Sequence, residues 1–170
     1  LIPIIEDCAH SMGSEYKNKK LGNHGNICVY SFQAIKHFTT GDGGVMVLPN
    51  KNLYERAKLL RWYGIDRNTN KKDFRCEEDV SEWGYKYHMN DINATIGIHN
   101  FPLFLERGEK YTENSKYYDE QLQNTQGVTV LAKQKDRKSA SWIHTIKVEN
   151  RDSFMELMKE KGIMVSRVHE

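Results

Sequence analysis

The sequence lacks an excess of charge of either sign, and it lacks a long apolar run. Its 170 residues include 25 lysines and arginines against 23 aspartates and glutamates, which gives a formal net charge of +2. Such a balance argues against a nucleic-acid-binding protein, in which basic residues usually dominate one face. No apolar run reaches membrane-spanning length, and no signal peptide is visible. We therefore expect neither nucleic acid nor a membrane among its partners.

Cysteine is scarce and does not have the spacing of a metal site or a redox motif. The three cysteines are Cys8, Cys28 and Cys76; they form no CxxC pair, and two of them lie in apolar, strand-like contexts. We read them as buried thiols of a protein that resides in the reducing cytoplasm. The seven histidines form no HxH or HExxH pattern, and no acidic loop has calcium spacing. The sequence therefore predicts no metal site.

Two further motifs are missing, the GxSxG elbow of serine hydrolases and the P-loop of nucleotide-binding proteins. The run Gly41–Gly44 resembles a phosphate loop, but the GK[ST] ending is absent. We expect these glycines to shape a turn behind Lys36. Two short basic clusters, Lys17–Lys20 and Lys133–Lys138, are read as solvated loops, with a nucleic-acid patch as the alternative.

Two short apolar runs are each followed closely by polar residues of chemical interest. The run Leu1–Ile5 leads to Asp7, and the run Ile27–Tyr30 leads to Ser31 and then to Lys36. Such runs predict buried strands, and the carboxyl ends of strands in open α/β sheets form the ligand crevice. An acid, a hydroxyl and an amine at neighbouring strand ends suit pyridoxal phosphate. That cofactor needs an anionic partner for its ring nitrogen, donors for its phosphate and an amine for a Schiff base.

Each of these residues also has a plainer interpretation. Lys36 could be a surface lysine on a loop, and Asp7 could be a turn or helix-capping aspartate, which is common in α/β proteins. His10 follows Asp7 by three residues, and a histidine that stands alone is more often structural. The interpretation of Lys36 as a nucleophile requires an amine that is desolvated and loses its proton before it attacks a carbonyl.

Four blocks of the sequence together resemble the DegT-type (DegT/DnrJ/EryC/StrS) family of sugar-nucleotide aminotransferases. The blocks are Ile5–Ser11, Ser31–Lys36, Thr40–Gly44 and Gly84–Ala94. They occur in the family's order and with its approximate spacing. Because members of this family are usually much longer and this chain begins within an apolar run, we expect it to be an internal fragment of a longer enzyme.

The resemblance implies an α/β fold. We expect part of the large domain of the fold-type I pyridoxal-phosphate transferases, with a mixed, mostly parallel sheet and flanking helices. The start of a small α+β domain would follow it.

The resemblance also implies roles for single residues. Lys36 would form the Schiff base and shuttle a proton, Asp7 would pair with the pyridinium nitrogen, and His10 would lie near the cofactor ring. Ser31 would donate to the cofactor phosphate. Lys86 stands where the family usually has asparagine, in a segment that approaches the phosphate of the neighbouring subunit's cofactor. A lysine there could bind phosphate as a point charge, and a structural turn is the alternative.

The implied activity is transfer of an amino group from glutamate to a keto group of a nucleotide-linked deoxysugar, carried out by a homodimer. Such amino sugars enter surface polysaccharide and lipopolysaccharide. One alternative is a sugar dehydratase of the same family, in which histidine replaces the Schiff-base lysine; here Lys36 is present and His37 merely follows it. A second alternative is a non-catalytic relative that keeps the fold for binding or scaffolding.

The expected elements divide the chain into three parts. Residues 1–101 form part of the large domain, with strands near 1–6, 27–32 and 45–48 and helices near 51–62 and 91–101. Asn50 and Asn90 are the expected caps of these two helices. Leu53, Ala57, Leu60 and Tyr63 recur at helical spacing, so we expect one face of the first helix to be buried.

Pro102 fits the first turn of a second, connecting helix over residues 102–123. Gly108 and Ser115 are expected to allow close packing along it. Residues 124–170 then begin the small domain, with strands at 127–131, 142–148 and 163–168 and a helix at 151–161 that Gly162 ends.

Overall fold

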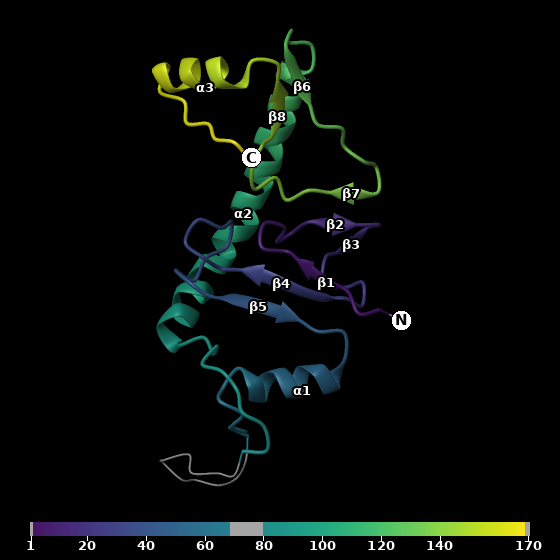
Figure 1. Cartoon of the computed structure of the whole chain (residues 1–170), viewed down its shortest axis with the longest axis vertical. Helices are drawn as coiled ribbons and strands as arrows, with labels where there is room; N and C mark the ends of the chain where they lie inside the picture. The colour runs from purple at the N-terminus through teal and green to yellow at the C-terminus, as the bar shows by residue number, and fades with distance from the viewer. Residues whose placement is uncertain (1, 69–79, 169–170) are drawn as a thin grey trace.

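The computed structural model describes residues 2–68 and 80–168. One long helix, α2, runs along the length of the molecule, and the strands lie beside it (Figure 1). In chain order the elements are β1 (Ile5–Asp7), β2 (Glu15–Tyr16), β3 (Lys19–Lys20), β4 (Ile27–Ser31), β5 (Gly44–Val47), α1 (Lys51–Leu60), α2 (Asp91–Leu122), β6 (Val128–Val130), β7 (Arg137–Lys138), β8 (Ile146–Val148) and α3 (Arg151–Glu160).

The central sheet is mixed and has the strand order β1-β4-β5. β1 and β4 are parallel, with Asp7 opposite Val29. β5 is antiparallel to β4, with Gly44 opposite Ser31. Because β1 and β4 run the same way, their carboxyl ends bring Asp7 and Ser31 to one edge of the sheet, as the sequence predicted.

The core is small and is formed by the central sheet, the segment after β4 and the residues that pack on them, Phe104 of α2 among them. Its buried members are Cys8, Cys28, Tyr30, Phe32 and Phe38. The Phe38 ring meets Phe32 edge-on at 4.7 Å between centroids. From α2, the Phe104 ring lies 6.0 Å from Phe38, also edge-on. Aromatic contacts of this kind bury large areas in favourable geometry, so they attach α2 to the segment that follows β4.

The helix α2 is continuous over 32 residues, with Pro102 in its interior. The prediction of two helices that meet at Pro102 is therefore wrong. Proline removes one backbone hydrogen bond, but the packing of α2 on the core holds the helix together on both sides of it. Ser115 is buried as expected, at 6% exposure. Gly108 has open space around it, so the expected close packing there is also wrong.

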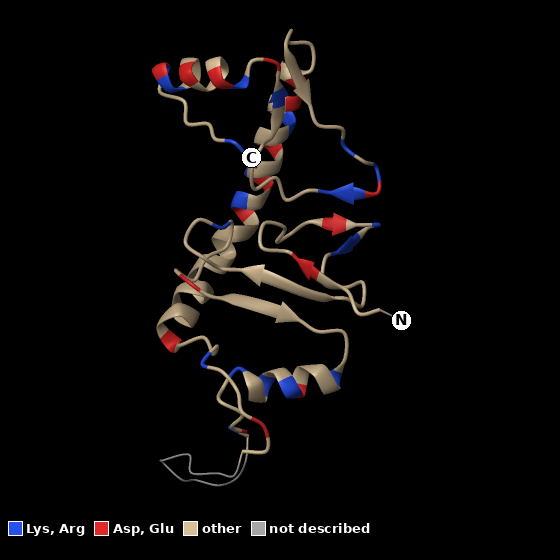
Figure 2. Ribbon diagram, in the orientation of Figure 1, with Lys and Arg blue, Asp and Glu red and all other residues tan. Residues whose placement is uncertain are grey.

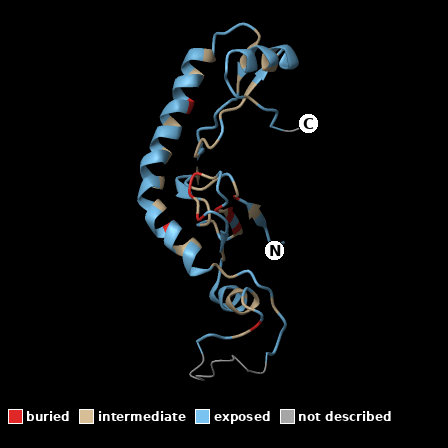
Figure 3. Ribbon diagram, turned by 90° about the vertical axis from the view of Figure 1, so that its left-hand side faces the viewer, coloured by how far each residue is buried: buried red, intermediate tan, exposed pale blue. Residues whose placement is uncertain are grey.

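Figure 3 shows α2 as a curved rod whose surface is mostly exposed. Among the described residues, α2 included, no helix combines the length and the apolar character that a membrane span requires. The division of the chain into two domains joined by residues 102–123 remains a prediction.

The helix α1 begins as the sequence predicted, because the Asn50 side chain accepts a hydrogen bond from the Leu53 amide. Its expected buried face is not formed: no residue of α1 is buried, and Leu53 is 37% exposed. Within the described part of the chain, no other helix or strand packs closely on α1.

The first basic cluster, Lys17–Lys20, lies in the hairpin of β2 and β3. A third strand, β7, pairs with β2 from the far end of the chain, so that Glu15 lies opposite both Lys20 and Lys138. Glu15 and Lys20 form an ion pair of 2.7 Å. Parts of the two basic clusters that were interpreted as separate solvated loops thus join one small sheet, in which Glu15 of β2 lies between the basic residues of β3 and β7 (Figure 2).

The C-terminal part contains β6 and β8, which are antiparallel, and α3 (Figure 1). The strand expected at 163–168 is not formed; these residues have no regular secondary structure. The Ile163 amide donates instead to the Met158 carbonyl, and the Gly162 amide donates to the Lys159 carbonyl. These bonds satisfy the end of α3 as the chain turns away, and Gly162 has the positive φ of 73° that such an ending favours.

Candidate functional site

Asp7 and Ser31 each make one local hydrogen bond at the end of its strand. Asp7 Oδ1 accepts from the Ala9 amide at 3.0 Å. Ser31 Oγ accepts from the Gln33 amide at 3.3 Å. The first bond is typical of an aspartate in a turn. The plainer interpretation of Asp7 therefore accounts for the hydrogen bond of one carboxylate oxygen, Oδ1. As an acceptor in the second bond, the Ser31 hydroxyl keeps its own O–H as a donor for a ligand.

Lys36 lies on a short excursion that leaves β4 and returns to it. The Lys36 amide donates to the Gln33 carbonyl at 3.0 Å, and the Thr40 amide donates to the Phe32 carbonyl at 3.0 Å. The Phe32 amide in turn donates to the Gly43 carbonyl at 2.8 Å. Gly43 has a φ of 132°, a conformation that only glycine adopts readily. The glycine run therefore shapes the turn that carries Lys36, as the sequence predicted.

Two amide side chains of α2 hold this turn from behind. Asn93 Nδ2 donates to the Asp42 carbonyl at 2.8 Å, and Asn100 Nδ2 donates to the Thr39 carbonyl at 3.0 Å. Thr40 is 2% exposed, and its hydroxyl donates to the Asp42 carbonyl at 2.6 Å. The sequence interpretation missed this role of the two asparagines. Their seven-residue spacing, which places them on one helix face, was the available signal.

Lys36 and His10 meet on one aromatic ring, that of Trp142. Lys36 Nζ lies 4.7 Å from the centre of this ring. The His10 ring stacks on Trp142 with centroids 4.0 Å apart and an interplanar angle of 21°. Trp142 was expected only as the beginning of a strand, but the structure starts β8 at Ile146. Nothing in the local pattern around Trp142 indicates that it reaches Lys36.

His37 faces away from this group. It is buried, and its ring meets Tyr111 of α2 edge-on at 4.5 Å. Burial lowers the pKa of His37, since the charged imidazolium loses its hydration. Lys36 and His37 are adjacent in the sequence but differ in their contacts. His37 packs against α2, and Lys36 lies over Trp142.

Cys8, Cys28 and Tyr30 form a buried group within the core. Burial, and then the neighbouring Cys28, raises the pKa of Cys8 to about 11. Burial likewise raises the pKa of Tyr30. A Glu6 carboxylate oxygen and the two cysteine sulfurs lie within 4.8 Å of one another, but Glu6 Oε1 already accepts from Asn26 Nδ2 at 2.6 Å. The absence of a metal site remains a prediction.

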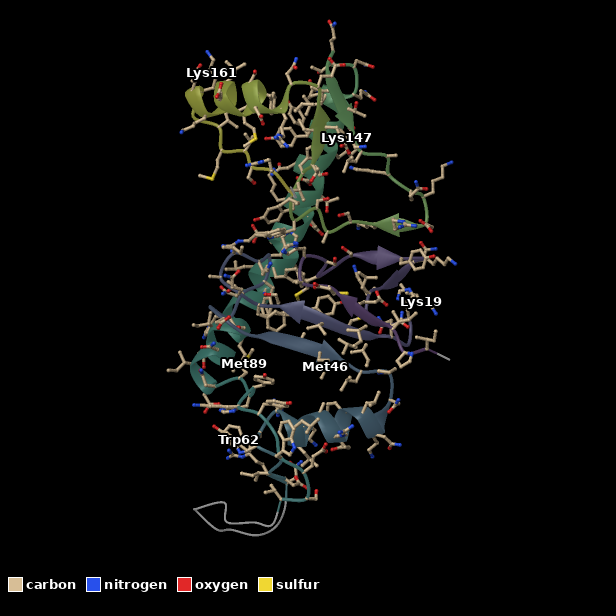
Figure 4. The ribbon with its side chains drawn as sticks, in the orientation of Figure 1. Lys19, Met46, Trp62, Met89, Lys147 and Lys161 are labelled. Atoms are coloured by element: carbon tan, nitrogen blue, oxygen red, sulfur yellow. The ribbon has the colours of Figure 1, made fainter. Side chains whose placement is uncertain are left out.

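Lys86 does not join the Lys36 group. It forms an isolated β-bridge with Trp62, at the α1 end of the molecule, where Figure 4 labels Trp62. The His88 ring contacts the same indole, with centroids 3.6 Å apart. Burial, and then the charges of Lys86, Arg61 and Arg67, lowers the pKa of His88. Lys86 is exposed there, and its expected role toward a neighbouring subunit remains a prediction.

The groups at the sheet edge fit pyridoxal phosphate by their chemistry. Asp7 offers a carboxylate for a ring nitrogen, Ser31 a hydroxyl for a phosphate, and Lys36 an amine for the aldehyde carbon. Asp7 and Ser31 stand at the ends of adjacent parallel strands, and Lys36 leaves the end of the same strand as Ser31. The residues present therefore suit the group that the sequence predicted.

Comparisons with known proteins agree with this architecture. The model of the DegT/DnrJ/EryC1/StrS aminotransferase family matches residues 1–170. The UDP-4-amino-4,6-dideoxy-N-acetyl-beta-L-altrosamine transaminase of Campylobacter jejuni is 35% identical over 140 residues, which are 82% of this chain and 36% of the relative.

Two crystal structures superpose closely. AtS13 from Actinomadura melliaura has a TM-score of 0.92 at 43% identity, covering 99% of this chain and 44% of its own. The sugar aminotransferase CalS13 from Micromonospora echinospora has a TM-score of 0.88 at 40% identity, covering 94% and 43%. These structures confirm the predicted fold class, and this chain spans less than half the length of each relative. The chain belongs to the DegT/DnrJ/EryC1/StrS aminotransferase family.

Proposed function

We propose that the intact protein is a cytoplasmic, pyridoxal-phosphate-dependent aminotransferase. It transfers an amino group from glutamate to a keto group of a nucleotide-linked deoxysugar. The observation that carries this proposal is the placement of Lys36 on a braced turn directly after the strand that ends in Ser31, beside the strand that ends in Asp7. The names of the transaminases and sugar aminotransferases among its relatives support it.

When bound, the cofactor supplies an electrophilic carbon that takes up the amino group and a ring that accepts an electron pair. Asp7 holds a proton at the ring nitrogen. Ser31 donates its hydroxyl to the phosphate and so fixes the orientation of the ring. Each of these groups acts from a strand end, where the backbone hydrogen bonds of the sheet limit its movement.

Lys36 would hold the cofactor through its amine until the amino donor arrives, and would then serve to move a proton. Its Nζ would take the proton from the α-carbon of glutamate and deliver it to the cofactor carbon that carries the amino group; with the keto sugar the same Nζ would move a proton in the opposite direction. The hydrogen bonds from Asn93 and Asn100 keep the turn of Lys36 in place. A lysine on a mobile loop would not keep its amine within reach of both atoms.

The dehydratase alternative requires a histidine in the place of the lysine. Lys36 Nζ lies over the ring of Trp142, whereas His37 is buried against Tyr111. This arrangement favours the transaminase. We further propose a homodimer, in which Lys86 of each subunit, exposed near α1, binds the phosphate of the cofactor in the other.

The test uses the intact protein with pyridoxal phosphate, glutamate and a panel of nucleotide-linked keto sugars. We expect a bound-cofactor absorbance band and amino-sugar product in the wild type. Lys36→Ala should lose the band that the lysine adduct produces and about 10²- to 10⁴-fold of the rate. Lys58→Ala, which removes a lysine from α1, is the matched control and should keep both. A wild-type protein that takes up no cofactor would leave only the scaffold alternative.

A further inference from the structure

Trp142 makes three contacts with the residues around Lys36, although it lies far away in the sequence. Its indole N–H donates to the Ile35 carbonyl at 3.1 Å. Its ring lies 4.7 Å from Lys36 Nζ and stacks on the His10 ring at 4.0 Å. The hydrogen bond fixes the N–H edge of the indole against the turn that carries Lys36. Lys36 Nζ and the His10 ring contact the flat surface of the indole.

The segment that delivers Trp142 is fastened to the N-terminal half of the chain. β7 pairs with β2 just before it, with Arg137 opposite Tyr16 and Lys138 opposite Glu15. The Ala140 amide then donates to Ser14 Oγ at 2.9 Å. These contacts hold β7 and Ala140, so the segment that leads to Trp142 is fixed two residues before it.

We propose that Trp142 is a positioning residue for the amine of Lys36 and for the His10 ring. This inference rests on the proposed function, and it assigns the site a component from the C-terminal half of the chain. The indole gives the amine a fixed resting place whenever Lys36 is not bonded to the cofactor carbon. It also orients His10 beside the strand end that carries Asp7.

Such a resting place matters because Lys36 alternates between a bonded and a free state in each turnover. A flexible lysine side chain has many rotamers. Time spent in the unproductive ones delays the return of Nζ to the reacting carbon. A cation over an indole face is attracted to the ring electrons, and tryptophan is the best of the aromatic partners for this. The ring therefore reduces the number of positions that the free amine occupies.

The first readout is the chemical accessibility of Lys36 in the cofactor-free intact protein. Lysines are modified competitively with an amine-acylating reagent and quantified by peptide mass spectrometry. In Trp142→Leu we expect the rate at Lys36 to rise about two- to fivefold, as loss of a cation–π contact of ordinary strength predicts. Trp142→Phe keeps a ring and should show a smaller rise.

Lys58 is the internal control, because its Nζ lies 5.3 Å from the centre of the Tyr54 ring and far along the chain from Trp142. Its rate should not change in either variant. An unchanged rate at Lys36 in Trp142→Leu would overturn the proposal. So would an equal rise at Lys58, since that result would assign the effect to general loosening of the fold.

The second readout is the kinetics of the cofactor-loaded enzyme with glutamate. A positioning role predicts that Trp142→Leu lowers kcat more than it raises KM, and that Trp142→Phe recovers part of kcat. A loss confined to KM, or no recovery with phenylalanine, would contradict it. If the wild type binds no cofactor, the proposed function fails while the acylation result still decides whether Trp142 holds the amine.

Discussion

Gly97 of α2 lies directly against Thr40, at the back of the turn that carries Lys36. A Cβ atom at position 97 would lie 2.8 Å from Thr40 Cγ2 and 3.4 Å from the Phe38 ring. Thr40 is held by its own hydrogen bond to the Asp42 carbonyl. The absence of a side chain at Gly97 therefore lets α2 approach closely enough for its two asparagines to reach the turn.

Gly97→Ala should destabilise the protein. The added methyl group gains helix propensity of up to about 1 kcal/mol, but it must displace Thr40 or the helix, and overpacking of this kind costs about 1–3 kcal/mol. We expect a net loss of about 1 kcal/mol, with lower cofactor affinity because the Lys36 turn shifts. Urea unfolding and cofactor titration of the intact protein measure the two effects.

Gly108→Ala is the matched control, since nothing lies within 4 Å of a Cβ atom at that position of the same helix. It should be neutral or stabilising by up to about 1 kcal/mol. If both substitutions changed stability in the same direction, close packing at Gly97 would not be the cause.

A second prediction concerns the helix caps. Asn50 Oδ1 accepts from the Leu53 amide at 3.0 Å, so Asn50→Ala should cost about 1 kcal/mol. Asn150 precedes α3 without a side-chain capping bond, and Asn150→Ala should cost less. Hydrogen exchange of the amides in the first turns of α1 and α3 reports the two effects locally. Equal acceleration in both helices would show that the Asn50 bond contributes nothing.

The part of the site that could be predicted from the sequence is the part that local signals encode. The apolar run Ile27–Tyr30 forms β4, and the glycines at 41 and 43 take the positive φ that their turn requires. Asp7 and Ser31 follow from the same signals, because the ends of parallel strands share one edge. Their roles toward a cofactor remain predictions that rest on the family resemblance.

The part that could not be predicted depends on contacts between distant segments. β7 and β2 have only two residues each, too few to show an alternating pattern, and their pairing joins residues 15–16 to 137–138. Trp142 follows from that pairing and not from its neighbours. The prediction of a helix boundary at Pro102 was wrong for a different reason. Proline is favoured in the first turn of a helix, but tertiary packing can hold it in the interior of one.

A third prediction concerns the loss of stability at acidic pH. Burial lowers the pKa of His37 below its ordinary value of 6.5, so the folded protein binds this proton less readily than the unfolded chain. The contribution of His37 to stability is therefore present above pH 6.5 and is lost as the pH falls through the lowered pKa. His37→Phe should flatten the dependence of the melting temperature on pH between about 5 and 7. A pH profile parallel to that of the wild type would contradict this assignment.

The fourth prediction concerns the loss of stability at alkaline pH. Burial and the adjacent Cys28 raise the pKa of Cys8 from 9.0 to about 11, so the folded state keeps a thiol where the unfolded chain forms a thiolate. The contribution of Cys8 is complete below pH 9 and is lost as the pH rises from 9 to 11. Cys8→Ala also leaves a small cavity, so the slopes of stability against pH, and not the absolute values, should be compared.

The slope above pH 9 should be shallower in Cys8→Ala than in the wild type. Because Tyr30 and Cys28 share the same buried group and also have raised pKa values, part of the slope should remain. The folded wild type should also react slowly with a thiol reagent at pH 8, since a protonated, buried sulfur is a poor nucleophile. Rapid labelling of Cys8 in the folded protein would mean that its sulfur is accessible to solvent. That result would contradict the assignment of the alkaline loss of stability to a buried Cys8 thiol.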